Sequence, residues 1–291
     1  MDAITVINAG INGVVIGMLL ALPALAITLV FGIARFPNAA SGDYMTLGAY
    51  AAVFTQALAG GSMLAGGLAA VAGTTLVSLF FYAWVFRPLE SRSNVSRLIA
   101  SIGVAFALRS TITFFAGQDQ YTFDLPLTRA WNFGGVRILP TDLYIVGTAV
   151  AALALVFALM HMTPTGRRMR AVADNPELAA ASGIRGRRVM ITLWSIAGAY
   201  CGLGGVLLGI KAVVIPELGW ELLMPMFAAV ILGGIGNPVG AIVGIMVFSI
   251  AQEIASLVVG PAYKIVFAFA VLLCVLLLRP QGIFGRPMAA R

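Results

Sequence analysis

The feature that most constrains this chain is a series of long apolar runs bounded by glycine, proline or charged residues. A membrane-spanning helix needs about 20 predominantly apolar residues, and the first run, near 8–33, exceeds that length. Eight further runs lie near 44–59, 63–86, 98–116, 141–161, 189–210, 221–233, 239–257 and 264–278. The chain is 60% hydrophobic and 10% charged, whereas soluble proteins carry roughly 25% charged residues.

These runs predict an all-α, polytopic helical membrane protein. We expect a single transmembrane domain over 1–291 with about eight to ten transmembrane helices, some of them broken or re-entrant. The run at 221–233 is the weakest candidate for a full crossing. It holds about a dozen apolar residues, contains Pro225 and ends in Gly233-Gly234, which is typical of a half-helix.

The basic residues predict the orientation. The segment 163–188 holds Arg167, Arg168, Arg170, Arg185, Arg187 and Arg188, and short basic loops stay in the cytoplasm. If the runs alternate, the loop with Arg87, Arg92 and Arg97 and the C-terminal tail lie on the same side. The loop 117–140 then lies outside, and with nine crossings so does the N-terminus. If the run at 221–233 does not cross, the N-terminus or one neighbouring run must be placed differently. The same rule explains the net charge of +7 without a nucleic-acid partner.

Several classes of site are excluded by composition. Cys201 and Cys274 both lie in apolar runs, and His161 is the only histidine, so neither a thiolate zinc site nor a histidine relay is expected. Neither Lys211 nor Lys264 follows the glycines of a phosphate-binding loop. We therefore predict no catalytic residues, no metal and no cofactor in this chain, and no ATP hydrolysis by it.

Glycines at three- or four-residue spacing indicate close helix contacts, because small residues let membrane helices approach each other. One such stripe comprises Gly198, Gly202, Gly205 and Gly209. Gly240 and Gly244 form a second pair of this kind.

The basic segment 163–188 contains the pattern of a short capped helix. Asp174 or Asn175 can cap it, Pro176 suits its first position and Gly183 can end it. A face of Leu178, Ala179 and Ser182 would then lie in a groove of a partner protein. The alternative is a solvated basic loop that only anchors the topology.

Two interruptions of the apolar pattern are candidates for a substrate path, because irregular backbone at membrane depth must be buried in protein or line a cavity. We expect these two segments to approach each other near the membrane interior. The alternative is that both are ordinary loops. Their residues are Asn38, Ser41, Gly42, Asp43, Gly233, Gly234, Gly236 and Asn237.

Three ionisable residues lie inside apolar runs: Arg109, Glu253 and Lys264. Such residues usually face the bundle interior or water. Glu253 and Lys264 can also lie near a membrane face with their charged ends in water, whereas Arg109 is about ten residues into its run.

Four segments, in order along the chain, resemble the permease subunits of bacterial ABC importers for branched-chain amino acids. The first is Ala26-Ile-Thr-Leu-Val-Phe-Gly-Ile-Ala-Arg with Asn38, Gly42-Asp43 and Leu47-Gly-Ala-Tyr. The second is 166–184, similar to the family's coupling loop. The third is Ala229-Val-Ile-Leu-Gly-Gly-Ile-Gly, and the last is Arg279-Pro-Gln-Gly-Ile-Phe-Gly.

The resemblance implies a permease that moves branched-chain amino acids or a related small polar solute across the bacterial inner membrane. It also implies a second homologous permease, two ATP-binding cassette subunits that hydrolyse ATP, and a periplasmic or lipid-anchored solute-binding protein. The coupling residues it implies are Gly166, Arg170, Ala171, Asn175, Pro176, Ala179, Gly183 and Ile184.

One departure from the family pattern leaves the cargo open. After Asn38 the family usually has Phe-Ala-His-Gly-Glu, whereas this chain has Ala39-Ala-Ser-Gly-Asp. Urea, short amides and other small solutes therefore stay open as cargo. Two other classes also stay open: an ion-coupled secondary transporter that uses Glu253, Asp43 or Arg109, and a membrane scaffold that transports nothing.

Overall fold

The computed structural model describes residues 3–126, 129–260, 263–278 and 282–284, and nearly all of its regular structure is helical. In order, the elements are α1 Ala3–Ala34, α2 Ser41–Leu58, α3 Met63–Phe81, the π-helix η1 Tyr82–Phe86, the 3-10 helix η2 Arg87–Leu89, α4 Asn94–Ala116, β1 Trp131–Phe133, β2 Val136–Ile138, α5 Pro140–Met162, α6 Pro164–Asp174, α7 Pro176–Ala181, α8 Gly186–Lys211, α9 Leu218–Gly233, α10 Pro238–Val259 and α11 Lys264–Leu278. The strands β1 and β2 form one antiparallel hairpin.

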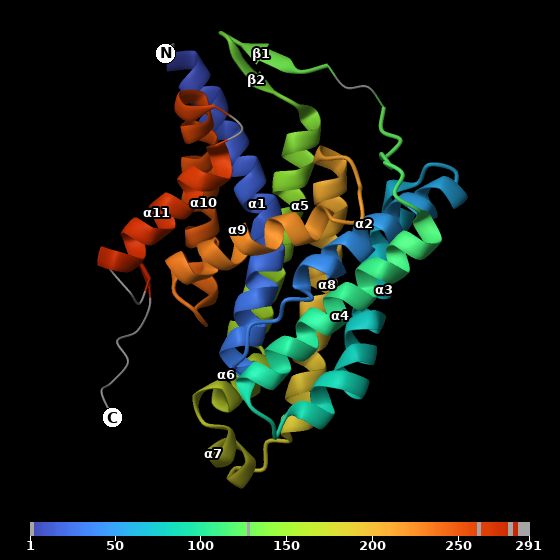
Figure 1. Ribbon diagram of the computed structural model, residues 1–291, viewed down its shortest axis with the longest axis vertical. Coiled ribbons are helices and arrows are strands. Elements are labelled where there is room, and N and C mark those ends of the chain that lie inside the picture. Colours follow the sequence, from blue (N-terminus) through green and yellow to red (C-terminus); the bar gives the residue numbers. More distant parts are fainter. Residues whose placement is uncertain (1–2, 127–128, 261–262, 279–281, 285–291) are drawn as a thin grey trace.

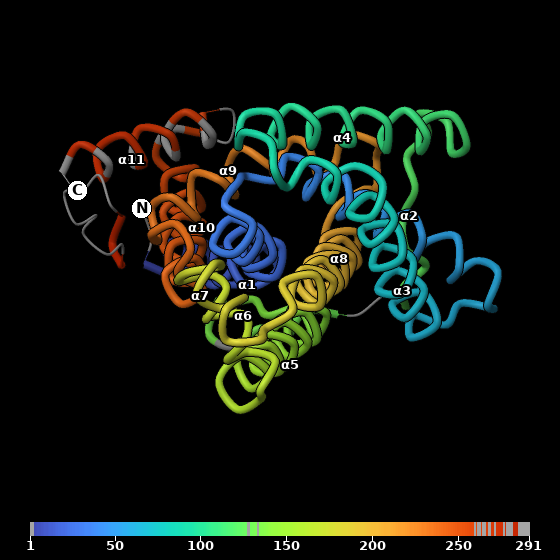
Figure 2. The backbone as a smooth tube through the Cα atoms, turned by 90° about the horizontal axis from the view of Figure 1, so that it is seen from below, coloured from blue at the N-terminus to red at the C-terminus, as the bar shows by residue number. Residues whose placement is uncertain are grey.

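The helices surround α1, which runs through the middle of the bundle (Figures 1 and 2). It packs along α10 and α8, and its second half, from Leu19 to Val30, is buried. The first apolar run of the sequence is thus a core helix as well as a candidate membrane span. This arrangement confirms the predicted polytopic helical fold.

Among the described residues, six helices are long and apolar enough to cross a membrane: α1, α3 with its continuation to Leu89, α4, α5, α8 and α10. This number is below the predicted eight to ten. Three predicted runs form the shorter helices α2, α9 and α11, of 18, 16 and 15 residues. At 1.5 Å per residue, α9 is only about 24 Å long, and it runs across α1 in Figure 1.

The glycine stripes lie where helices touch, as predicted. Gly202 of α8 packs against Gly48 of α2 and Thr74 of α3, and Gly205 packs against the backbone at Met45. Gly240 of α10 lies against Gly233 of α9. These contacts bring α2, α3 and α8 together on one side of α1, and α9 and α10 on another.

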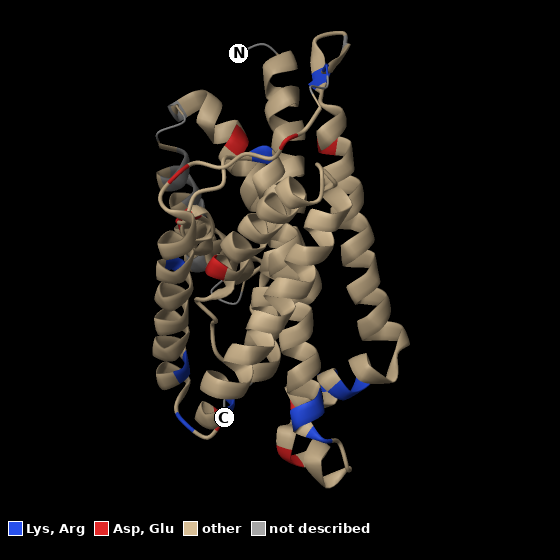
Figure 3. Cartoon of the chain, turned by 90° about the vertical axis from the view of Figure 1, so that its right-hand side faces the viewer, with Lys and Arg blue, Asp and Glu red and all other residues tan. Residues whose placement is uncertain are grey.

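The basic segments gather at one end of the bundle, around α6 and α7 (Figure 3). At this end, Arg97 of α4 donates to the carbonyl of Ala34 at 2.7 Å. At the other end, Asn8 of α1 donates to the carbonyl of Gly135 in the β-hairpin at 3.1 Å. This grouping agrees with the prediction that the segment 163–188 and the Arg97 loop lie on the same side. That this side is the cytoplasmic one remains a prediction.

Candidate translocation and coupling site

An ion pair joins two residues that the sequence marked separately. Asp43, in the first turn of α2, accepts from Arg109 of α4 at Oδ1···Nε 3.1 Å and Oδ2···Nη2 3.3 Å. The carboxylate is fully buried and 14% of the Arg109 side chain is exposed. Two parallel hydrogen bonds fix both the distance and the angle between these side chains. The pair therefore locks the start of α2 onto the middle of α4.

The beginning of α9 covers this ion pair. The guanidinium of Arg109 lies 4.4 Å from the ring centre of Trp220, a cation–π contact. The backbones of α2 and α9 also meet, because a Cβ on Gly42 would lie 2.5 Å from the carbonyl oxygen of Gly219. The amide of Gly219 donates to Thr46 Oγ1 at 2.9 Å. Three helices thus converge at one charged, tightly packed point.

The segment before α2 is buried beneath these contacts. Asn38 is 1% exposed, and its side-chain oxygen accepts from the amide of Ala40 at 3.1 Å. Ser41 and Gly42 are also buried. These residues thus form a packed, hydrogen-bonded support beneath α9, and their place along a substrate path stays a prediction.

The second predicted path segment lies elsewhere. Gly233 and Gly234 end α9, Gly236 lies close to Gly32 of α1, and Asn237 caps α10 by accepting from the amides of Val239 and Gly240. Because Gly42 contacts Gly219, at the opposite end of α9, about 21 Å of helix separates Gly42 from Gly233. Gly236, in contrast, lies beside Gly32, shortly before Asn38 in the sequence, and the approach of the two segments near the membrane interior stays a prediction.

Gly236 and Asn237 border a cavity of about 470 Å³ at the basic end, within the size range of small-molecule sites. Its wall also contains Thr28 of α1 and Arg170 of α6. Thr28 is fully buried, and its hydroxyl has no hydrogen-bond partner among the residues that the structure describes. The structure therefore brings the second path segment next to the predicted coupling segment.

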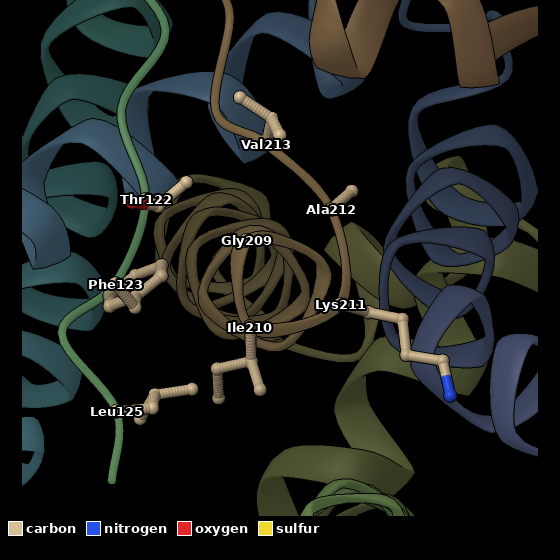
Figure 4. A pocket seen from close by; sticks show the side chains of 8 residues that line it. All are labelled: Thr122, Phe123, Leu125, Gly209, Ile210, Lys211, Ala212 and Val213. Carbon is tan, nitrogen blue, oxygen red and sulfur yellow. The ribbon is translucent and has the colours of Figure 1, made fainter. Parts of the chain in front are cut away.

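A smaller cavity of about 210 Å³ lies at the other end, between 122–125 and the end of α8. In Figure 4 the side chain of Lys211 extends away from the other lining residues. Its ammonium instead pairs with Asp142 of α5 at 2.5 Å. This cavity is consequently a weaker candidate for a site that binds a polar solute.

The short capped helix exists as predicted. Asn175 accepts from the amides of Glu177 and Leu178 at 3.0 Å each. Gly183 has φ +80° and donates to Ala180, while Ile184 donates to Ala179. These two bonds form the glycine-terminated end that satisfies the last carbonyls of a helix.

The predicted docking face needs one correction. Ala179 is only 4% exposed, because α7 packs against α6 and α8, whereas Leu178 is 65% exposed. Leu178 and Ser182 therefore remain on the outer surface of α7, and Ala179 belongs to its inner surface.

The helix α6, which holds α7 against the bundle, was not predicted from the sequence. Thr163 caps it and Pro164 is its first residue. Gly166, Met169 and Val172 are buried at three-residue intervals, and Arg170 donates to the carbonyl of Met160. Ala171 is half-buried and accepts from the amide of Asn175. The pair Thr163-Pro164 and the three-residue spacing of the buried positions could have predicted this helix, but both lie in a segment rich in arginine.

Arg35 joins α6 to the core. Its Nη2 lies 2.9 Å from the carbonyl of Ala173 and 3.4 Å from that of Asp174, at the C-terminal end of α6. A cation there complements the helix dipole. Arg35 has φ +59° and is, within the described part of the chain, the only residue besides glycine with positive φ. The corner between α1 and α2 is thus tied to the base of α7.

Glu253 and Lys264 are the other two ionisable residues that the sequence places inside apolar runs, and the structure describes the side-chain contacts of Glu253 only. Asn12 of α1 donates to Glu253 of α10 at 3.0 Å. Lys264 begins α11, and its side chain lies outside the described residues. Of the C-terminal motif, only 282–284 is described, where Ile283 and Phe284 donate to the carbonyls of Leu232 and Gly233. The predicted orientation of the basic tail lies outside the described residues.

Residues 10–276 match the family model "Branched-chain amino acid transport system / permease component". The chain belongs to this family. The resemblance inferred from the sequence motifs is thereby confirmed, and the chain is the transmembrane permease component of an ABC transport system. Such a permease has ATPase and solute-binding components as partners.

Relatives of this branched-chain amino acid permease span nearly its full length. The high-affinity branched-chain amino acid transport system permease protein LivH of Escherichia coli is 31% identical over 95% of this chain and 94% of its own. BraD of Pseudomonas aeruginosa, a permease of the same description, is 30% identical over 95% of each chain. The ribose import permease protein RbsC of Bacillus subtilis is 30% identical over 59% of this chain.

A solved structure also resembles this permease. A chain of PsaBC from Streptococcus pneumoniae in complex with Fab has a TM-score of 0.53 and covers 95% of this chain and 92% of that one. At 14% identity the likeness concerns the fold alone. The fold is thus one already known among solved structures, and the chain is a multi-pass membrane protein homologous to bacterial permeases.

Proposed function

We propose that this permease carries branched-chain amino acids, or a related small polar solute, across the inner membrane of a bacterium as one half of an importer. Its partners in this proposal are a second homologous permease, two ATP-binding cassette subunits and a periplasmic or lipid-anchored binding protein. The observation that supports it best is α7, a capped helix with exposed Leu178 at the basic end. α7 is joined through α6 to the end of α1.

Coupling would proceed through these contacts. ATP binding closes the two ATPase subunits and shifts the grooves in which α7 lies. Because α6 and α7 share Asn175 as their common cap, a shift of α7 moves α6. Arg35 passes the movement to the corner between α1 and α2, and the two permeases alternate between outward-open and inward-open states.

The helices α4, α9 and α11 lie on one side of the bundle (Figure 2), and this side is where we expect the second permease subunit to bind. There Glu221 of α9 is exposed, and a carboxylate at membrane depth is unfavourable against lipid. A second permease covering this side would separate Glu221 from lipid. The path would then run between the two permeases and reach the cavity beside Thr28 and Asn237.

The burial of residues 39–41, where the chain departs from the family pattern, favours a leucine-like amino acid as the first cargo to test. Ala39, Ala40 and Ser41 are all buried, so the missing aromatic and histidine change the packing beneath α9 more than the surface along which a solute moves. The cargo of the branched-chain relatives therefore remains the best supported candidate.

The test is reconstitution in proteoliposomes with ATPase and solute-binding subunits of the branched-chain amino acid transport type from the same organism. We expect ATP-driven uptake of radiolabelled leucine in excess over ribose and urea. Leu178→Asp should prevent co-purification of the ATPases, because it places a charge on the docking surface. Gln118→Asp, exposed at the opposite end, is the control and should leave co-purification intact.

An ion-coupled transporter is the alternative for the same residues. Asp43, Arg109 and Glu253 would be its coupling sites, but Asp43 is bound by Arg109 and Glu253 accepts from Asn12. Uptake that stops with an ionophore and continues without ATP would favour this alternative and contradict our proposal.

A further inference from the structure

The outer face of α9 carries a charge. Glu221 and Met224, three residues apart on this helix, are both exposed, whereas Leu223 and Met226 are buried. Residues three apart lie on the same face of a helix. Within the described part of the chain, the Glu221 carboxylate takes part in no ion pair or side-chain hydrogen bond. A bare carboxylate therefore points out of the bundle.

The depth of Glu221 follows from its neighbour. Trp220 covers Arg109 of α4. Arg109 lies 12 residues after Arg97 and seven before Ala116, which corresponds to about 18 Å and 10 Å along α4. Glu221 is thus beside a part of an apolar helix of 23 residues that is about two turns from its outer end and far from the basic end. At this depth a carboxylate faces water or protein, because hydrocarbon cannot solvate it.

The neighbours of Glu221 indicate which solute would pass. Met224 is 55% exposed and Phe106 of α4, which contacts Trp220, is 53% exposed. The positive charge of Arg109 is already held by Asp43. The accessible surface thus combines the negative charge of Glu221 with large apolar side chains. It complements a protonated amine attached to an aliphatic body, and it offers little to an uncharged sugar.

We propose that Glu221 lines the aqueous substrate path and contacts the protonated amino group of a passing aliphatic amino acid. This inference rests on the proposed function, because it requires that the side formed by α4 and α9 bounds the route. It adds a substrate-contacting residue on α9, between the two predicted path segments.

The first experiment measures the electrostatic field of Glu221 in the assembled transporter. In a background with Cys201→Ala and Cys274→Ala, Met224→Cys is treated with a cationic and an anionic methanethiosulfonate reagent. We expect the cationic reagent to react roughly tenfold faster, and Glu221→Gln to abolish the preference. Leu76→Cys on α3, exposed on a different side, is the lipid-facing control and should react with neither.

The second experiment measures uptake of radiolabelled leucine. Glu221→Gln should lower the maximal rate about tenfold, the loss of one charge-assisted hydrogen bond. Co-purification of all subunits checks that the variant complex assembles. Glu221→Asp, which keeps the charge, should restore part of the rate.

The outcomes separate this inference from the proposed function. Lack of ATP-driven leucine uptake by the unmodified complex would contradict the proposed function. If the unmodified complex transports leucine, unreactive Met224→Cys, a reaction without charge preference, or full uptake by Glu221→Gln would each overturn the role of Glu221.

Discussion

The two breaks in the helical pattern have similar sequences and different surroundings. The break between α1 and α2 contains Pro37 and Asn38, and the break between α9 and α10 contains Asn237, which Pro238 follows as the first residue of α10. The first is buried, with Asn38 1% exposed. The second has Ile235 and Gly236 exposed and borders the large cavity.

The difference arises from what packs on each break. The start of α9 lies on the start of α2, and the Asp43–Arg109 pair fastens both to α4. The second break instead forms one wall of a cavity whose other walls are α1, α5 and α6. The first break is thus built as a rigid support. The second is placed where a movement of α6 changes the shape of the cavity.

The largest expected effect concerns the ion pair at the first break. Arg109→Gln should lower the free energy of unfolding by about 3–5 kcal/mol, because it leaves the buried carboxylate of Asp43 uncompensated. Adding Asp43→Asn should recover much of this loss. Thermal unfolding in nanodiscs measures both. Arg92→Gln, exposed at the basic end, is the control and should change the free energy of unfolding by less than about 0.5 kcal/mol. Equal costs would refute the rigid support.

A second pair of variants tests the packing of the two breaks directly. Gly42→Ala should destabilise the protein by about 1–3 kcal/mol, because its Cβ would meet backbone atoms of Gly219. In Gly236→Ala the new Cβ would lie 3.5 Å from the Cα of Gly32, an ordinary contact distance. The expected cost is therefore only that of a positive φ of +80°, about 1 kcal/mol. Unfolding midpoints give the comparison. A larger loss for Gly236→Ala would reverse our assignment of the rigid and open breaks.

Local features of this chain were predictable from sequence, and pairings across the fold were not. Asn175, Pro176 and Gly183 act within one short helix, so their pattern predicted its caps. The glycine stripes predicted that helices touch there without naming the partner helix. Asp43 and Arg109 are 66 residues apart, and nothing in either segment selects the other. Only the tertiary fold pairs them.

Glu221 and Arg35 were not predicted as functional residues from the sequence, and the reason is the same for both. Glu221 stands at the first position of the predicted run 221–233, where a charge is usual at a membrane surface. The structure places α9 across the bundle, so its first turn lies at depth. Arg35 resembles an ordinary basic residue after a membrane helix. Its role depends on α6, whose carbonyls lie 138 residues away in sequence.

A smaller effect is expected at Arg35, which connects the first break to α6. Arg35→Gly should change the free energy of unfolding by less than about 1 kcal/mol, because glycine accepts the positive φ and offsets the lost hydrogen bonds. The number of solutes moved per ATP should fall roughly fivefold. Arg92→Gly, exposed at the same end, should leave this ratio unchanged. An unchanged ratio in Arg35→Gly would show that the contact does not transmit movement.

The smallest effect is expected at Thr28, in the wall of the cavity at the second break. Thr28→Val keeps the shape of the side chain and removes a buried hydroxyl without a partner in the described part of the chain. The free energy of unfolding should stay equal or rise by up to about 1 kcal/mol, since an unsatisfied polar group is removed. If the hydroxyl contacts solute or water in the path, the maximal uptake rate should fall about twofold to threefold. Thr74→Val is the contrasting variant, because the Thr74 hydroxyl donates to the carbonyl of Ala70 at 2.6 Å and its removal acts on helix packing alone. Equal uptake by Thr28→Val and the unmodified protein would show that the cavity does not belong to the substrate path. The second break would then differ from the first only in how tightly it is packed.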